Sequence, residues 1–152
     1  MFDLINGLPV HPLVVHAVVV LLPLAVLGTI AIALKPDWRA AYGKLVVAVT
    51  VAATALIPVA TSSGEALEKH VGDPGKHAQL GDQLIWFAIP LLLLDVALVY
   101  LDRRKDTGRT LLNGVAMLAV VASLAAGVQV YRVGDSGARA AWGDQVSAGS
   151  HH

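Results

Sequence analysis

The sequence predicts an all-α integral membrane protein, a four-helix up-down bundle that forms a single domain over residues 1–152. Three observations support this fold class. First, 56% of the residues are hydrophobic and 14% are charged, a composition typical of membrane-spanning chains rather than of soluble domains. Second, four apolar stretches approach the length of a membrane span. Third, the connections within the first and the last pair of stretches are short, which favours antiparallel neighbours.

A helix needs roughly 20 apolar residues to cross a hydrocarbon core of about 30 Å. We expect membrane-spanning helices at residues 13–34, 45–64, 84–101 and 110–131. The first, second and fourth contain no Asp, Glu, Lys or Arg, and only Asp95 interrupts the third. A loop over 65–83 is expected between the middle spans. Gly134 and Gly137 are expected to break the fourth helix and leave a short interfacial tail over 132–150.

The first span begins with two histidines. The preceding segment MFDLINGLPVHP has no Lys or Arg, so it lacks the basic region of a cleaved secretory signal, and we expect a retained span. Pro12 suits the first position of a helix, which predicts that His11 caps the helix from outside and that His16 lies about one turn in. Within one regular helix the two imidazoles would diverge by about 140°, so their convergence requires His11 to be the cap.

The connection between the middle spans carries a second pair of histidines. Its GDPG at residues 72–75 is a turn signal, which should end the helix that holds Glu65 and His70. A new helix should then begin near His77. This arrangement would let His16 and His77 face each other close to the outer surface of the membrane.

Asp95 is an ionisable residue within a predicted span, which makes it a functional candidate by default. Hydrogen bonds are expected from Thr50 or Thr54 on the second span and from Asn113 on the fourth. We favour a neutral, hydrogen-bonded acid that holds helices together over a proton relay. Its depth separates it from the histidines by more than half of the bilayer, so one site containing both is not expected.

Orientation follows from the basic residues that flank the spans, because Lys and Arg are retained on the cytoplasmic side. Seven lie in the two short connections: Lys35, Arg39, Lys44, Arg103, Arg104, Lys105 and Arg109. Four lie on the opposite side: Lys69, Lys76, Arg132 and Arg139. We therefore expect a protein of the cytoplasmic (inner) membrane with both termini and the histidine-rich loop outside.

Several functional classes are not indicated. The chain has no cysteine, which removes disulfides, thiolate metal sites and iron–sulfur clusters. Its formal net charge of zero provides no overall electrostatic attraction to nucleic acid. The GDSG at residues 134–137 matches only four residues around the nucleophile of trypsin-like proteases, without the strands or cysteines of that fold. No combination of nucleophile and base is present, so substrate turnover is not expected.

The leading hypothesis is a redox or electron-transfer module that holds haem b. His16 and His77 would be the axial ligands, because bis-histidine ligation needs two facing imidazoles, and Arg132 and Arg139 would pair with the propionates. Without cysteine the haem would be held non-covalently. His11 would be an alternate ligand or would support the ligands.

Two other hypotheses remain open. The first is a metal-binding or transport-accessory protein that holds copper, zinc or iron through His11, His16 and His77, with Glu65 nearby. The second is a structural bundle that binds a membrane partner or a second copy of itself, in which the histidines only cap and pack. The terminal GSHH resembles a tag remnant, so His151 and His152 are set aside.

Three segments carry a resemblance: GLPVHPLVVHAVVVLLPLA, then SSGEALEKHV followed by KHAQLGDQ, then YRVGDSGARAAW. Together they resemble bacterial membrane proteins of domain-of-unknown-function family 2231, mainly through the HPxxVH motif. The resemblance implies His11, His16 and His77 as the positions of interest, with Glu65 behind them. That family has no assigned reaction, so the resemblance supports fold and membrane location. A looser similarity to four-helix b-type cytochromes is architectural only.

Overall fold

The computed structural model describes residues 4–5, 8–71 and 75–148. A short antiparallel pairing of two strands, β1 (Leu4–Ile5) and β2 (Leu8–Pro9), precedes the helices. The helices are α1 (Val10–Leu34), α2 (Pro36–Val71), α3 (Lys76–Gln83), α4 (Ile85–Arg103) and α5 (Arg109–Ala148). Helices α3 and α4 follow each other with a short interruption at Leu84 and together form one span, residues 76–103.

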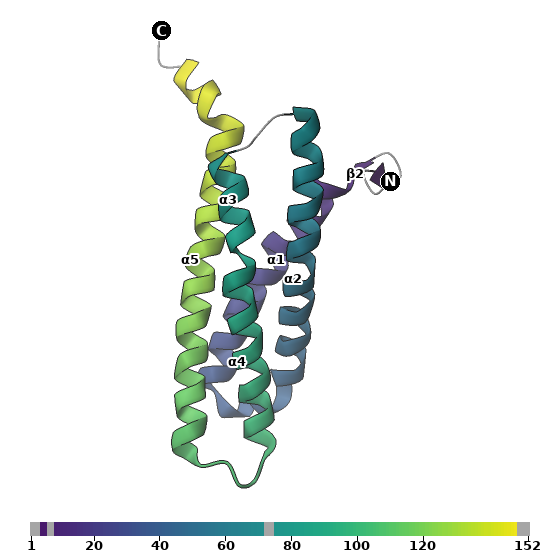
Figure 1. The fold of residues 1–152 in the computed structure, drawn as a ribbon. Coiled ribbons are helices and arrows are strands. Elements are labelled where there is room, and N and C mark those ends of the chain that lie inside the picture. Colours follow the sequence, from purple (N-terminus) through teal and green to yellow (C-terminus); the bar gives the residue numbers. More distant parts are fainter. Residues whose placement is uncertain (1–3, 6–7, 72–74, 149–152) are drawn as a thin grey trace.

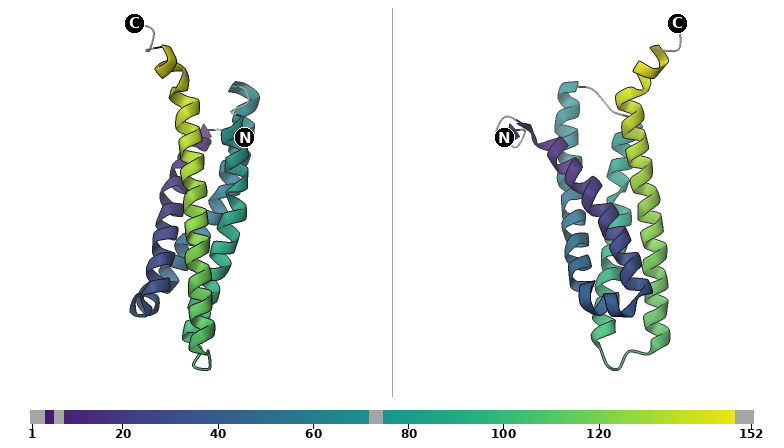
Figure 2. Two further views of the ribbon diagram at one scale, coloured as in Figure 1. Left: turned by 90° about the vertical axis from the view of Figure 1, so that its left-hand side faces the viewer. Right: turned by 180° about the vertical axis from the view of Figure 1, so that it is seen from behind.

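The helices form an up-down bundle of two hairpins (Figures 1 and 2). One hairpin is α1 with α2, and the other is α3 and α4 with α5. Helix α1 packs against α2 and α5, and α4 packs against the same two helices. We call the end that holds the start of α1 and the C-terminal ends of α2 and α5 the terminal end, toward the top of Figure 1. The opposite end, where each hairpin turns, is the hairpin end.

The predicted fold class is confirmed. Among the described residues four helical segments are long and apolar enough to cross a membrane: residues 10–34, 36–66, 76–103 and 109–143. Large apolar side chains such as Leu27, Leu93 and Met117 are exposed on the outside of the bundle. In a membrane protein this surface faces lipid, where exposure of apolar side chains carries no penalty.

The helices are longer than the predicted spans. Helix α2 begins at Pro36, so only Lys35 separates it from α1. Proline is favoured at a first helical position because its missing N–H is unpaired there in any case. Helix α5 runs without interruption to Ala148, so the expected break at Gly134 and Gly137 is wrong. A glycine inside a helix costs only about 1 kcal/mol, and packing against α3 offsets that cost.

The turn predicted at residues 72–75 lies mostly outside the described residues. The helix before it ends, and the helix after it begins, close to the expected residues. Helix α2 ends at Val71 and α3 begins at Lys76. Gly75, directly before α3, has a φ of 60°. This left-handed backbone conformation is strained for other residues, so glycine is required at the start of α3.

The core has two apolar layers. The layer nearer the terminal end includes Val18, Leu22, Ile57, Leu84 and Leu91. The layer nearer the hairpin end includes Ile32, Val46, Leu98, Val99 and Ala119. Completely buried polar residues, among them Thr29, Thr50 and Asp95, lie along the same inward faces.

A buried arginine joins the two hairpins at the hairpin end. Arg39 Nε donates to the Ile32 carbonyl oxygen at 2.8 Å, and its Nη2 donates to the Ala33 carbonyl oxygen at 2.9 Å. These carbonyls belong to the last turn of α1, where no helical N–H remains to pair with them. Arg39 Nη1 also pairs with Asp102 Oδ1 on α4 at 3.1 Å. One side chain therefore connects α1, α2 and α4.

Candidate histidine site

His11 lies against α2. Helix α1 begins at Val10, so His11 is in the first helical turn, and the expectation that it caps the helix from outside is wrong. Its Nδ1 lies 3.1 Å from the Ala60 carbonyl oxygen and 3.0 Å from Ser63 Oγ. The ring covers Gly64, where an added Cβ would lie only 3.1 Å from His11 Cε1. A side chain at position 64 would therefore push the ring away.

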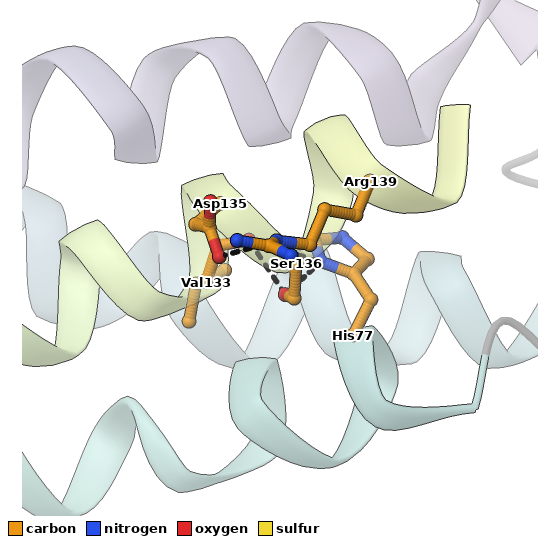
Figure 3. Close-up of polar contacts among 5 residues, drawn as sticks. All are labelled: His77, Val133, Asp135, Ser136 and Arg139. Atoms are coloured by element: carbon orange, nitrogen blue, oxygen red, sulfur yellow. Dashed lines mark hydrogen bonds and ion pairs between the residues drawn. The ribbon is translucent and has the colours of Figure 1, made fainter. Parts of the chain in front are cut away.

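His77 lies against α5 in the same way. Its Nδ1 is 3.2 Å from the Val133 carbonyl oxygen and 3.1 Å from Ser136 Oγ. Figure 3 shows the ring reaching from α3 to this turn of α5. A Cβ added at Gly137 would lie 3.0 Å from His77 Cε1. The uninterrupted α5 helix and its glycine at 137 thus provide the surface on which the ring rests.

The two arrangements have the same construction, and we call each one a histidine seat. A seat consists of a half-buried imidazole on the first helix of a hairpin, with a carbonyl oxygen, a serine hydroxyl and a glycine on the second helix. In both seats the serine lies three residues after the carbonyl and the glycine follows the serine. The two hairpins are therefore alike in structure at the terminal end.

Sequence reasoning missed the serines and glycines of both seats. The available signal was a Ser-Gly pair that recurs on the second helix of each hairpin, at Ser63–Gly64 and Ser136–Gly137. These serines follow their histidines by 52 and 59 residues. The second pair belongs to the GDSG segment, which has a packing role in this structure.

The contacts of the two rings favour one tautomer of each imidazole. A carbonyl oxygen only accepts, so Nδ1 of His11 and of His77 must donate to it. The serine hydroxyls donate to the same carbonyls, Ser63 to Ala60 at 3.0 Å and Ser136 to Val133 at 2.8 Å. We therefore assign the Nδ1–H tautomer to both rings. The Nε2 atom of each ring then carries a lone pair. A neutral imidazole with such a lone pair is the form of histidine that binds metals.

Both seated histidines lie on the bundle-facing sides of their helices. His11 precedes the buried Val18 by seven residues, and His77 precedes the buried Leu84 by seven. Seven residues correspond to about two helical turns, so each histidine shares a face with the core residue below it. The seats thus present two imidazoles on the inward side of separate hairpins at the terminal end.

His16 has a different environment. It is exposed, and its Nδ1 contacts the Pro12 carbonyl oxygen of its own helix. It lies two residues from the buried Val18, about 200° around the helix, so it is on the side of α1 that faces away from the core. Because both histidines lie within one regular helix, the expected convergence of His11 and His16 is wrong.

The other candidate residues lie around the seats. Glu65 is exposed on α2 and directly follows Gly64. Arg139 Nε pairs with Asp135 Oδ2 on its own helix at 2.9 Å (Figure 3). Arg132 Nη1 donates to Gln129 Oε1 at 3.3 Å. The side chain of His70 lies outside the described residues, and within the described part of the chain no three His, Asp or Glu side chains gather as a metal-ion cluster.

Asp95 forms a separate polar centre. Its Oδ2 accepts from Thr50 Oγ1 at 2.7 Å, as predicted, and from Thr29 Oγ1 at 3.0 Å, which was not predicted. Of the two threonines expected as alternatives, Thr50 is the partner, and Thr54 donates to the Thr50 carbonyl oxygen instead. Asn113 is exposed, so the expected bond from Asn113 is wrong. Asp95 Oδ1 has no hydrogen-bond partner among the described residues. The carboxyl group thus connects α4 to α1 and α2.

A comparison with known families matches residues 7–149 to a family described as predicted membrane protein (DUF2231). The chain belongs to the DUF2231 family. The match covers all four spans of this DUF2231 protein and both histidine seats, so the seats lie within the family domain. No curated protein and no solved structure matches the chain.

Proposed function

We propose that this DUF2231 protein is a membrane-embedded redox module that holds haem b non-covalently between His11 and His77. The pair of histidine seats carries the proposal. Each seat holds one imidazole through Nδ1, so Nε2 of that ring would be the ligand atom. Metal-binding histidines usually donate their other ring N–H to a carbonyl or carboxylate, which orients the ring and raises its basicity.

The number and arrangement of the imidazoles favour haem. A haem b iron accepts one axial ligand on each face. Four-helix bundles hold such groups between side chains of facing helices. Here the two seated rings come from different hairpins at the same end of the bundle. Two seated imidazoles agree in number with the two axial positions of one porphyrin.

In this proposal His11 takes the axial role that the sequence-based hypothesis gave to His16. His16 is exposed on the outer side of α1, whereas His11 is half-buried and held by α2. In this proposal His16 is a surface residue near the membrane boundary. The second ligand, His77, is unchanged from the sequence-based hypothesis.

Arg132 and Arg139 are the proposed propionate partners. They lie four residues before and three residues after Ser136, so all three share one face of α5 near the His77 seat. The Arg139–Asp135 pair is solvent-exposed, with 79% and 42% of the two side chains accessible, and a pair of this kind is weak. A propionate could replace Asp135 as the partner at little energetic cost.

The proposed orientation places both seats at the outer face of a bacterial cytoplasmic membrane. The basic side chains of the hairpin end, including Arg103 and Lys105, favour the cytoplasmic side for that end. Electrons would then be exchanged with a partner at the terminal end, close to the seats.

A second candidate is a transition-metal ion, copper, zinc or iron, bound by the same Nε2 atoms. The observation in its favour is Glu65, a carboxylate residue that directly follows Gly64 of the His11 seat in the sequence. Imidazole and carboxylate ligands suit these metals.

One detergent preparation distinguishes the candidates. The protein is expressed with a haem precursor, purified, and its absorbance spectrum is recorded beside an elemental analysis. We expect a Soret band and one iron per chain, extracted as haem b. Copper or zinc at one per chain without a Soret band would support the ion. Protein free of both after supplementation with haem and with metal would overturn both proposals and leave a structural bundle.

A further inference from the structure

A shallow groove lies on the outside of the bundle between α2 and α4, in the half near the hairpin end. Its volume is about 390 Å³. Most of its wall is apolar and is formed by Val47, Ala48, Val96 and Val99. Because α2 and α4 are neighbours whose outer faces meet lipid, an acyl chain is the natural occupant of such a wall.

The two basic residues of the groove lie at its end nearest the hairpin turns. Lys44 on α2 and Arg103 on α4 line that end, together with Tyr100. Both basic side chains are exposed, and within the described part of the chain neither forms an ion pair. The neighbouring Asp102 is already paired with Arg39. The mouth of the groove therefore carries two positive charges that no described acid neutralises.

Aromatic residues show that these charges lie at the depth of lipid headgroups. Trp38, Tyr42 and Tyr100 are exposed at the same end of the bundle. Lys35 Nζ lies 4.2 Å from the Trp38 ring centre, and Arg104 lies over Tyr100. Exposed Trp and Tyr side chains concentrate at the boundary between headgroups and hydrocarbon. This pattern indicates that Lys44 and Arg103 lie at the depth of lipid phosphates.

We propose that this groove binds one anionic phospholipid of the bilayer, with the headgroup phosphate between Lys44 and Arg103 and one acyl chain against Val47, Ala48 and Val96. The groove extends along α4 from Val96 to Arg103, about 10 Å at the helical rise, which matches the first part of an acyl chain. Basic pockets between membrane helices are known to bind anionic headgroups. The site is independent of the histidine seats, which lie at the opposite end.

The test uses native mass spectrometry of the full chain in micelles with equal amounts of phosphatidylglycerol and phosphatidylethanolamine. The wild type should retain phosphatidylglycerol preferentially. A basic group that pairs directly with an anionic headgroup should favour that lipid by about fivefold, so Lys44→Gln with Arg103→Gln should lower the phosphatidylglycerol preference by roughly 25-fold. Both side chains are exposed, so folding should be unaffected.

Two further variants make the result specific. Lys105→Gln with Arg109→Gln removes two exposed charges at the same end that do not line the groove, and it should keep the preference within about twofold of wild type. Ala48→Phe should fill the groove and reduce retention of both lipids. Equal losses in the two charge variants, or no lipid preference in the wild type, would overturn the proposal. A dimer that Ala48→Phe dissociates would also overturn it, because a second copy would then cover this face.

Discussion

Ser136 Oγ lies 3.1 Å from Nδ1 of His77, a residue that precedes it by 59 positions. The same hydroxyl donates to the Val133 carbonyl oxygen at 2.8 Å, so the ring, the hydroxyl and the carbonyl form one closed set of contacts. Ser63 makes the corresponding contact with His11 at 3.0 Å. The sequences around His11 and His77 differ, yet each imidazole is held by a backbone carbonyl oxygen and a serine hydroxyl.

Removing a seat serine should weaken cofactor binding without unfolding the bundle. Mutation of groups that orient metal-binding histidines typically lowers affinity by about 10- to 100-fold. We expect Ser63→Ala and Ser136→Ala to raise the haem dissociation constant by that factor in an absorbance titration. Ser62→Ala is the matched control, because Ser62 is exposed beside the seat. Wild-type affinity in both seat variants would show that the hydroxyls do not orient the rings.

The two glycines of the α5 segment 134–137 should respond in opposite ways. An added Cβ at Gly137 would lie 3.0 Å from the His77 ring, whereas nothing lies within 4 Å of one at Gly134. Gly137→Ala should therefore displace His77 and reduce haem occupancy. Gly134→Ala should keep occupancy and stabilise α5 by about 1 kcal/mol, since alanine favours the helix. Haem content and thermal unfolding are measured for both variants. Equal haem occupancy in Gly137→Ala and Gly134→Ala would contradict this prediction.

Asp95 should contribute to stability through its bonds to two other helices. Hydrogen bonds between membrane helices average about 0.6 kcal/mol and reach about 1.7 kcal/mol. Asp95→Leu removes both threonine bonds and should lower the free energy of unfolding by about 1–2 kcal/mol. Asp95→Asn keeps an acceptor oxygen and should cost less than half as much. Unfolding by titration with a denaturing detergent measures both, and an asparagine variant as unstable as the leucine variant would contradict this role.

Two arginine–aspartate pairs should differ strongly in their effect on stability. Arg39 is only 4% accessible and also binds two carbonyls of α1, so Arg39→Ala leaves several polar groups unpaired. We expect a loss of about 3–5 kcal/mol. The Arg139–Asp135 pair is exposed, so Arg139→Ala should cost less than about 0.5 kcal/mol. The same detergent titration compares them, and similar losses would show that Arg39 is not the connection between hairpins described above.

The spans were predictable because membrane helices require long apolar runs, which composition reveals directly. The separation of Asp95 from the histidines followed from their positions along the spans. The start of α1 two residues before Pro12 was not predictable from propensity, and with it His11 is half-buried against α2 whereas His16 is exposed. Such a shift changes which side chain faces the core, since each residue turns the helix by about 100°.

The partners across the bundle were the least predictable part. Thr29 reaches Asp95 over 66 residues of sequence, and Ser63 reaches His11 over 52. Contacts of this kind depend on the rotation of each helix about its axis, and the hydrophobic pattern of a membrane helix fixes that rotation poorly because both core and lipid are apolar. The recurrent Ser-Gly pair becomes informative only once the helices are paired.

The central claim is tested most directly by the absorbance spectrum of haem-supplemented wild-type protein beside His11→Ala, His77→Ala and His16→Ala variants of equal helical content. We predict a low-spin bis-histidine spectrum in the wild type and in His16→Ala. That spectrum should be lost in His11→Ala and His77→Ala, because each removes one seated ligand. A spectrum that survives both of these substitutions, or one lost only in His16→Ala, would contradict ligation by the two histidine seats.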